Sequence, residues 1–329
     1  MIKKLTVCNT QCTDPYTNIA VEKYLTLNVG ATERIMFLWR NDRTVVIGRN
    51  QSAYRECDVS RLEADGGHLA RRLSGGGAVF HDLGNLNFTF ISRKDNFNIS
   101  EQLEIITDAC RRLGINAEKS GRNDITVDGR KFSGNAFYRA GDCCYHHGTL
   151  LLRSDPELFG RYLKVDDSKL KAKGVGSVRS RICNLNEFRP DITPEFMARA
   201  LEESFAEGSN IATHRLSVEE LDTVKINEYR DYLSSFGWIF GRPIDFEKEI
   251  ERRFEWGNVD IFFKIDHGTV SDAAVYSDAM KQDIAGIIRD ALVGRQYRRE
   301  DLADAARMLK VALGSKASSD LELMMMEEI

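Results

Sequence analysis

The amino-acid sequence predicts an α+β fold with two domains, the second smaller than the first. Segments rich in β-forming residues come early and helical segments follow them, whereas a doubly wound parallel sheet would alternate the two. The segment "FGRPIDF" at 240–246 has the glycine and proline typical of a boundary, and a short β-α-α unit follows it. A chain of 329 residues has room for both domains, which we place at residues 1–242 and 243–329.

Composition and charge argue against a nucleic-acid-binding, membrane-spanning or secreted protein. The chain is 42% hydrophobic and 29% charged, and its net charge of −4 gives no electrostatic reason to expect nucleic-acid binding. It has no run of about 18 apolar residues and no apolar core after its two N-terminal lysines, so we expect neither a membrane span nor a signal peptide. Seven cysteines without a repeated metal-ligand spacing indicate reduced thiols and a cytoplasmic protein.

The N-terminal half predicts two helices and four strands. Asp14 as N-cap and Pro15 in the first turn start a helix, and Gly30 ends it. The β-rich runs 34–39 and 44–48 are separated by the polar "RNDR", which predicts a hairpin. Two more strands follow at 78–82 and 86–92, and then an amphipathic helix at 101–114.

The rest of the chain, from residue 115 on, carries two clear turn signals. Asp128-Gly129 lies within alternating apolar residues at 124–137 and predicts a tight hairpin. His267-Gly268 predicts a second hairpin, in the small domain. The other expected elements are a strand at 146–152 and helices near 193–206, 218–234, 281–293 and 300–314.

The stretch "RRLSGGGAVFHD" at 71–82 predicts an anion-binding turn that enters a strand. Glycines let successive backbone N–H groups approach an anion closely, and the spacing is neither that of a P-loop nor that of a dinucleotide-binding fingerprint. Arg71 and Arg72 supply fixed positive charge, and Ser74 offers one more hydrogen bond. A plain surface turn would not need three glycines, so we favour the anion site. His81 and Asp82 follow the anion-binding turn in sequence, and we assign them no role.

Lys131 is the second candidate. It follows the expected hairpin turn, and the small residues at 133, 134 and 136 leave room beside it for a ligand. A cation there stabilises charge on a phosphate or on a developing oxyanion. Asp124, seven residues earlier, is a candidate for holding Mg²⁺ between phosphates.

Four motifs in order give the chain a family resemblance. The segments "RRLSGGGAVFHDLGNLNFTF", "GRNDITVDGRKFSGNA", "HHGTLLL" and "KGVGSVRSRICNL" together resemble the lipoate–protein ligase A family, and the likeness extends over essentially the whole chain. The resemblance implies a fold shared with biotin protein ligases, which is a mixed β-sheet with flanking helices. It also implies a catalytic first domain and a small C-terminal accessory domain.

The resemblance implies a two-step reaction. Free lipoate or octanoate and ATP, with Mg²⁺, would give the acyl-AMP and pyrophosphate. The acyl group would then pass to a lysine of a lipoyl domain, such as those of 2-oxo-acid dehydrogenases or the glycine cleavage H protein. With no dimer signal in the sequence, we expect a monomer.

The resemblance also implies roles for single residues. Lys131 is the catalytic residue and contacts both phosphate and lipoyl carbonyl. The residues implied for ATP or AMP are Arg72, Gly75, Gly76, Gly77, Ala78, Val79, Phe80, Asn85 and Lys131. Those implied for lipoate are Ser74, Lys131, Ala136 and His147, with Asp124 for Mg²⁺ and Phe37, Val46 and Ile47 as further wall residues.

One position departs from the family pattern. Some relatives have an aromatic residue and then an arginine after "SGNA", with the arginine near the ligand, but here the run is Phe137-Tyr138-Arg139. Arg139 comes one position late, so on a strand it faces the other side. Its role is therefore left open, and Tyr138 is a candidate to replace it.

Three alternatives remain. An acyltransferase of the same fold would work without ATP through a cysteine thioester, with Cys144 or Cys183 as the candidate. A degenerate paralogue would bind lipoate or nucleotide without catalysis. A biotin ligase would carry a different, arginine-rich glycine loop.

Overall fold

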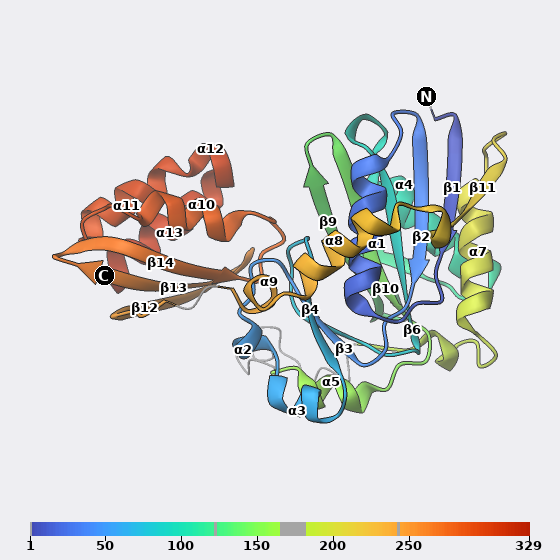
Figure 1. The fold of residues 1–329 in the computed structure, drawn as a ribbon, viewed down its shortest axis with the longest axis horizontal. Helices are drawn as coiled ribbons and strands as arrows, with labels where there is room; N and C mark the ends of the chain where they lie inside the picture. The colour runs from blue at the N-terminus through green and yellow to red at the C-terminus, as the bar shows by residue number, and fades with distance from the viewer. Residues whose placement is uncertain (1, 122–123, 165–181, 242–243) are drawn as a thin grey trace. The chain divides into compact units, whose positions relative to one another are not determined.

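The computed structural model describes residues 2–121, 124–164, 182–241 and 244–329 (Figure 1). These residues divide into two compact units. The first unit contains Met1–Val46, Cys57–Ala70 and Val79–Ile239. The second contains Phe240–Ile329 together with two segments of the N-terminal half, Ile47–Glu56 and Arg71–Ala78. The glycine loop therefore belongs to the second unit.

The elements of the first half are β1 (Lys4–Asn9), α1 (Pro15–Asn28), β2 (Glu33–Trp39), β3 (Thr44–Ile47), α2 (Ala53–Glu56), α3 (Val59–Ala64), β4 (His68–Arg71), β5 (Val79–His81), β6 (Asn85–Arg93), α4 (Ile99–Arg112), β7 (Glu118–Ser120), β8 (Asp124–Val127), β9 (Arg130–Ala140), β10 (Cys143–Leu151) and α5 (Pro156–Tyr162). Those that follow are α7 (Pro194–Ala206), β11 (Thr213–Ser217), α8 (Thr223–Ser234), α9 (Phe236–Phe240), β12 (Lys248–Phe254), β13 (Gly257–Asp266), β14 (Thr269–Ser277), α10 (Ile284–Leu292), α11 (Arg299–Met308), α12 (Lys310–Leu313) and α13 (Ser315–Glu328).

The first unit is built on an eight-stranded mixed sheet. Its strand order is β11-β1-β2-β6-β10-β9-β8-β7. Strand β1 runs parallel to β2 and β11, while β2, β6, β10, β9 and β8 pair antiparallel in turn. This mixed sheet with helices on its faces confirms the predicted α+β class.

The two faces of this sheet have different cover (Figure 1). On one, here called the back face, the side chains of β1, β2 and β6 join those of α4 and α7 in a large apolar core, with Met36, Phe88 and Leu201 fully buried. Helix α1 lies against the other, here called the front face. Because side chains alternate along a strand, neighbouring residues of β6 and β10 serve different faces. None of the helices among the described residues has the length and apolarity to cross a membrane.

The predicted hairpin of residues 34–39 and 44–48 is wrong. Both strands form, but β2 pairs with β1 and β6 in the large sheet, whereas β3 lies between β4 and β5 in a separate three-stranded sheet. The polar link between them thus changes sheet instead of turning back. Both strands find better partners far away in sequence, which a local turn signal does not reveal.

Local signals predicted other elements well. The Asp14 side chain accepts the Thr17 N–H at 3.0 Å, which confirms it as N-cap of α1. Asp128 and Gly129 have φ of 50° and 73°, as the tight turn between β8 and β9 requires. The hairpin at His267-Gly268, the strand at 146–152 and the helices at 101–114 and 193–206 are also present, with ends shifted by a few residues. Strands β1 and β11 and helix α13 were not predicted.

The second unit has its own core. Strands β12, β13 and β14 form an antiparallel meander that packs its apolar face against α10, α11 and α13, with Phe263 and Leu302 fully buried. Segment 47–56 is fixed to this meander by ion pairs from Arg55 to Glu249, Glu251 and Asp260.

Candidate active site

Strand register places five residues, among them the predicted site residue Asp124, in one row across the front face. Asp124 of β8 pairs with Gly134 of β9, whose N–H donates to Thr149 Oγ1 of β10 at 3.3 Å. Thr149 in turn pairs with Asn87 of β6, and Asn87 pairs with Trp39 of β2. We call these five residues the polar row.

Lys131 reaches this row from its own strand. Its Nζ lies 2.7 Å from Asp124 Oδ1, and it would be 3.0 Å from a Cβ at Gly134. A register shift between Ile125 and Thr126 lets the lysine share a face with the row. The Lys131 side chain is 38% exposed, so its ammonium is open to a ligand. The structure thus brings the two sequence-predicted charged residues together as an ion pair.

A second row lies two residues further along the strands, about 7 Å away. It contains Ala136 of β9, His147 of β10, Thr89 of β6 and Phe37 of β2. The lipoate candidates Ala136 and His147 are therefore direct neighbours. The Phe37 side chain, in this row on the front face, is fully buried.

A buried carboxylate from α1 joins this second row. Glu22 Oε1 accepts hydrogen bonds from His147 Nδ1 at 2.8 Å and from Thr89 Oγ1 at 2.7 Å, and Glu22 is 0% exposed. Trp39 Nε1 donates to the same threonine hydroxyl at 3.0 Å. The sequence analysis missed Glu22 and Thr89. The alternating polar residues of "NLNFT" in an apolar strand were the available signal.

A third row is aromatic. Tyr138 stacks on its pairing partner Tyr145 with ring centroids 5.0 Å apart, and Tyr145 lies 4.7 Å from the His147 ring. Arg139 serves the opposite face, where its Nε donates to the Gly141 carbonyl at 2.8 Å. Tyr138, and not Arg139, therefore shares a face with Ala136 and His147. The front face changes from charged at Lys131 to aromatic at Tyr138.

The glycine loop is organised by one arginine. Arg72 is 7% exposed, and its Nε donates to Ser74 Oγ at 3.0 Å. Its Nη2 donates to the carbonyls of Gly75 and Gly77, each at 2.7 Å. The predicted site residues of the loop are thus held together by this guanidinium.

Two positions of the loop require glycine, each for a different structural reason. A Cβ at Gly75 would lie 2.6 Å from the carbonyl oxygens of both Ala279 and Met280, so any side chain there would clash with backbone. Gly76 has φ of 90°, a conformation that side chains oppose, and its N–H donates to the Ala279 carbonyl at 2.9 Å. Gly77, in contrast, is exposed and has open space around it.

The other nucleotide candidates are spread along the chain. Ala78 ends the segment that belongs to the second unit, whereas Val79 pairs with Val46 in the small sheet of the first. The Phe80 side chain is buried between Phe159 and Tyr162, which leaves its backbone as the part that could read a base. Asn85 begins β6, fully buried on the front face. Val46 and Ile47 are both buried.

Three charged or polar residues near the loop have structural partners. Arg71 Nη1 donates to the carbonyls of Gly48, Arg49 and Gln51, and burial lowers its pKa to about 10. His81 Nδ1 is 3.2 Å from Asn41 Nδ2. Asp82 accepts the N–H groups of Gly84 and Asp155. These contacts fix the backbone on both sides of the glycines.

The candidate nucleophilic cysteines are both buried. Cys144 is 5% and Cys183 3% exposed, and burial raises the pKa of both thiols above the usual value. Cys183 lies close to the site through its backbone, because its N–H donates to the Lys131 carbonyl at 2.9 Å. A raised pKa reduces the thiolate fraction that a thioester mechanism needs.

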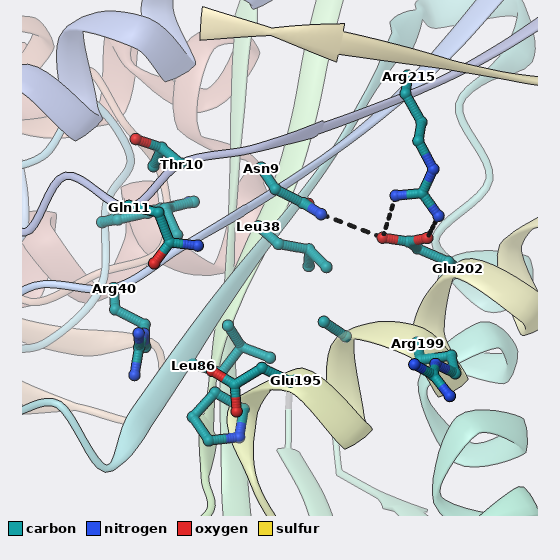
Figure 2. A pocket seen from close by; sticks show the side chains of 13 residues that line it. Asn9, Thr10, Gln11, Leu38, Arg40, Leu86, Glu195, Arg199, Glu202 and Arg215 are labelled. Carbon is teal, nitrogen blue, oxygen red and sulfur yellow. Dashed lines mark hydrogen bonds and ion pairs between the residues drawn. The ribbon is translucent and has the colours of Figure 1, made fainter.

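A separate pocket of about 270 Å³ lies where the ends of β1 and β2 meet α7 (Figure 2). Glu202 accepts hydrogen bonds there from Asn9 and Arg215, and Arg199 points away from this pair. Leu38 and Leu86 in its lining belong to the back-face core. None of the predicted site residues lines this pocket.

Fold and sequence together define the class of protein. Residues 14–206 match the lipoyl protein ligase A/B catalytic domain, and residues 244–324 match the bacterial lipoate protein ligase C-terminus. The chain thus contains both the catalytic and the C-terminal domain sequences of a lipoyl protein ligase. It belongs to the lipoate-protein ligase A family, as the four sequence motifs indicated.

Known relatives agree over nearly the full length. The chain is 39% identical to lipoate-protein ligase A of Psychrobacter cryohalolentis over 91% of both chains, and 36% identical to that of Bdellovibrio bacteriovorus over 99% and 98%. LipL1 of Plasmodium falciparum, solved in complex with lipoate, superposes with a TM-score of 0.81 at 30% identity, over 97% of this chain and 99% of that one.

Two further solved structures resemble part of the chain. A lipoate-protein ligase A with bound ATP superposes with a TM-score of 0.61 at 25% identity, over 73% of this chain and 99% of that one. A bi-partite lipoate protein ligase from Thermoplasma acidophilum, described with its E2 lipoyl domain, gives a TM-score of 0.63 at 27% identity, over 73% and 97%.

Proposed function

We propose that this protein is an ATP-dependent lipoate–protein ligase. In the first step, a carboxylate oxygen of free lipoate or octanoate attacks the α-phosphorus of ATP, and pyrophosphate leaves. In the second step, a lysine amine of a lipoyl-domain protein attacks the acyl carbonyl, and AMP leaves. The observation that carries the proposal is the Lys131–Asp124 pair at the charged end of a front face that becomes aromatic at Tyr138.

Lys131 stabilises charge in both steps. Negative charge develops on the α-phosphate in the first and on the acyl carbonyl oxygen in the second, and a fixed ammonium favours both transition states. The neighbouring Gly134 has no side chain to cover the Lys131 Nζ. The lysine acts by its charge and forms no covalent bond.

The glycine loop and the strand after it bind the nucleotide. Arg72 and the N–H groups of Gly75 and Gly77 would serve the phosphate, while Gly76, whose N–H donates to the Ala279 carbonyl, would shape the turn between them. The backbone of Ala78, Val79 and Phe80 would lie beside AMP, and Asn85 would contribute a polar group. The support is the network of Arg72, which holds the loop carbonyls in one conformation before any ligand binds. Preorganised donors cost no rearrangement when the anion arrives.

Mg²⁺ fits the front face as an ion shared with phosphates. The described residues contain no group of three or more His, Cys, Asp or Glu side chains that could hold a metal ion. Mg²⁺ commonly takes one or two carboxylates and completes its shell with phosphate oxygens and water. Asp124 would supply the carboxylate, and the ion would neutralise phosphate charge.

The acyl tail would lie along the second and third rows. Ala136 and His147 are its candidate contacts, and Ser74 is a candidate for the carboxyl end. Acceptor proteins are lipoyl domains, as the name of the Thermoplasma complex suggests for that ligase. We expect the enzyme to work as a monomer in the cytoplasm.

The test is lipoate-dependent exchange of pyrophosphate into ATP, followed by transfer to a purified lipoyl domain. Exchange with lipoate or octanoate, and none without them, is the expected result. Absence of exchange with both acids would show that the adenylation mechanism is wrong.

A variant with all seven cysteines replaced by serine separates this mechanism from the thioester alternative. Full activity is expected because no thiol takes part. Complete loss of transfer in a variant whose circular dichroism matches that of the wild type would favour the acyltransferase.

A further inference from the structure

The front side of β6 carries three polar side chains in an otherwise apolar strand. Asn85, Asn87 and Thr89 occupy alternate positions, and each is at most 1% exposed. The intervening Leu86 and Phe88 belong to the back-face core. Buried polar groups cost free energy unless they are hydrogen-bonded, so the partners of these three decide why they are there.

The hydrogen bonds of this strand leave polar atoms unused. The Thr89 hydroxyl accepts a hydrogen bond from Trp39 Nε1 and donates one to Glu22 Oε1. Asn85 Nδ2 donates to Asn87 Oδ1 at 3.0 Å, but within the part of the chain that the structure describes, Asn85 Oδ1 and Asn87 Nδ2 have no partner. Exchanging the oxygen and nitrogen of both amides would reverse this hydrogen bond and move the unpartnered nitrogen to Asn85; as the structure stands, the unpartnered nitrogen belongs to Asn87.

The spare donor lies in the polar row. Asn87 pairs across the sheet with Thr149, whose hydroxyl accepts the N–H of Gly134. The Lys131 Nζ lies beside Gly134, 3.0 Å from where a Cβ would be. One strand separates β6 from β9, so the backbones of Asn87 and Gly134 are about 10 Å apart. Asn87 and Gly134 thus lie on either side of Thr149 in the same row, two strand spacings apart.

The position along the strands indicates what Asn87 would contact. Asn85 is the candidate for the nucleotide, and the row with Ala136 and His147 is the candidate for the acyl tail. Asn87 lies between them, two residues from each along β6. In an acyl adenylate, the group between nucleotide and tail is the acyl carboxyl.

We propose that Asn87 binds the carboxyl oxygen of the acyl substrate through its side-chain N–H and so holds the reacting group. This inference rests on the proposed function and adds a substrate-contact residue to it. An amide N–H donates a stronger hydrogen bond to a charged carboxylate oxygen than to a hydroxyl oxygen, so Asn87 and Lys131 would both favour the ionised acid.

The experiment compares wild type with Asn87→Leu, which keeps the volume and removes the amide. Binding of lipoate, of its primary-alcohol analogue and of ATP is measured by calorimetry. The variant is expected to bind lipoate about tenfold more weakly, because a hydrogen bond to a charged acceptor is lost. Its affinity for the alcohol should fall by only about threefold, because a hydrogen bond to a neutral oxygen is weaker, and its affinity for ATP should stay within about twofold of wild type. Discrimination between acid and alcohol should therefore decrease.

Two controls separate binding from folding. Ser92→Ala removes another buried polar atom without a partner, on the back side of the same strand, and should leave all three affinities unchanged. The melting temperature of ligand-free Asn87→Leu should fall by only a few degrees, because the one hydrogen bond that the variant loses is that from Asn85 Nδ2 to Asn87 Oδ1. If the leucine variant does not fold, Asn87→Asp keeps the shape and should weaken lipoate binding through repulsion between carboxylates.

Each contrary result has a distinct meaning. Unchanged lipoate binding in folded Asn87→Leu overturns the proposal, and so does a loss confined to ATP, which would make Asn87 a nucleotide contact. Equal losses for lipoate and the alcohol would overturn it as well, since the carboxyl would not be the group recognised. If wild type itself binds no lipoate, the proposed function fails, independently of Asn87.

Discussion

The two faces of the large sheet differ most clearly at two adjacent histidines. On the back face, each ring nitrogen of His146 lies within hydrogen-bond distance of an amide group, Nδ1 at 3.1 Å from Gln102 and Nε2 at 2.8 Å from Asn135, among the aromatic side chains of the core. On the front face, His147 binds Glu22, whose second oxygen has no partner among the described residues. At these two positions, the back-face histidine has an amide partner at each ring nitrogen, whereas the front-face network keeps one carboxylate oxygen without a partner among the described residues.

The largest effect is expected at the charged end of the front face. Lys131→Ala should keep the fold, because the side chain is partly exposed, and should reduce single-turnover adenylation by about a thousandfold, since a preorganised charge is lost. Thermal melting tests the first half and rapid-quench kinetics the second. Lys119→Ala, a change at another ion-paired lysine, serves as control. A Lys131→Ala rate close to that of wild type would remove this residue from the mechanism.

The buried carboxylate of the front face should matter for stability. Glu22→Ala leaves the hydrogen-bonding groups of His147 and Thr89 without their common acceptor and opens a cavity under α1. We expect the unfolding free energy to fall by about 3 kcal/mol, measured by urea denaturation. Glu22→Gln keeps one acceptor oxygen and should cost less. Equal stability of all three proteins would mean that this network does not hold α1 to the sheet.

The buried histidine of the back face should make the protein less stable at acidic pH. Burial lowers the pKa of His146 to about 3, well below the value of about 6.5 in an unfolded chain. Below pH 6.5 the unfolded state therefore binds a proton that the folded state does not, and the unfolding free energy falls as the pH falls. Between pH 7 and 5 this one group removes about 2 kcal/mol. His146→Gln should lose correspondingly less over this range in urea titrations, and an identical pH dependence would contradict the assignment.

The smallest effect is expected at the pocket near α7. Arg199 is exposed and makes no hydrogen bond or ion pair with any residue in the described ranges. Arg199→Ala should change neither the unfolding free energy by more than about 0.5 kcal/mol nor the adenylation rate measurably. A clear loss of adenylation would show that the back of the molecule contributes to the reaction and would weaken the contrast between the faces.

Local chemistry explains which parts of the fold could be predicted. The turn at Asp128-Gly129 and the cap at Asp14 depend on a few consecutive residues, so the sequence reveals them. The hairpin predicted for residues 34–39 and 44–48 is wrong because strands far apart in sequence compete for pairing. Strand β11 joins the sheet only through β1, more than two hundred residues earlier, and no local pattern carries that information.

The candidate site divides in the same way. Lys131 and Asp124 were identifiable because a ligand needs charge, small neighbours and a turn in a recognisable order. Glu22 was not, because a glutamate in a helix normally faces solvent, and only the position of the sheet makes it buried. Arg71 shows the opposite error, since its charge suggested an anion while its partners are backbone carbonyls.

The chain of contacts from Trp39 to His147 has a fixed direction. An indole can only donate, so the hydroxyl of Thr89 accepts from Trp39 and its single proton points to Glu22. With the carboxylate accepting from both sides, His147 must carry a proton on Nδ1. In its neutral form the imidazole is therefore a single tautomer with its lone pair on Nε2. The indole thus sets the direction of the threonine hydroxyl, and the buried carboxylate of α1 sets the tautomer of the histidine on β10.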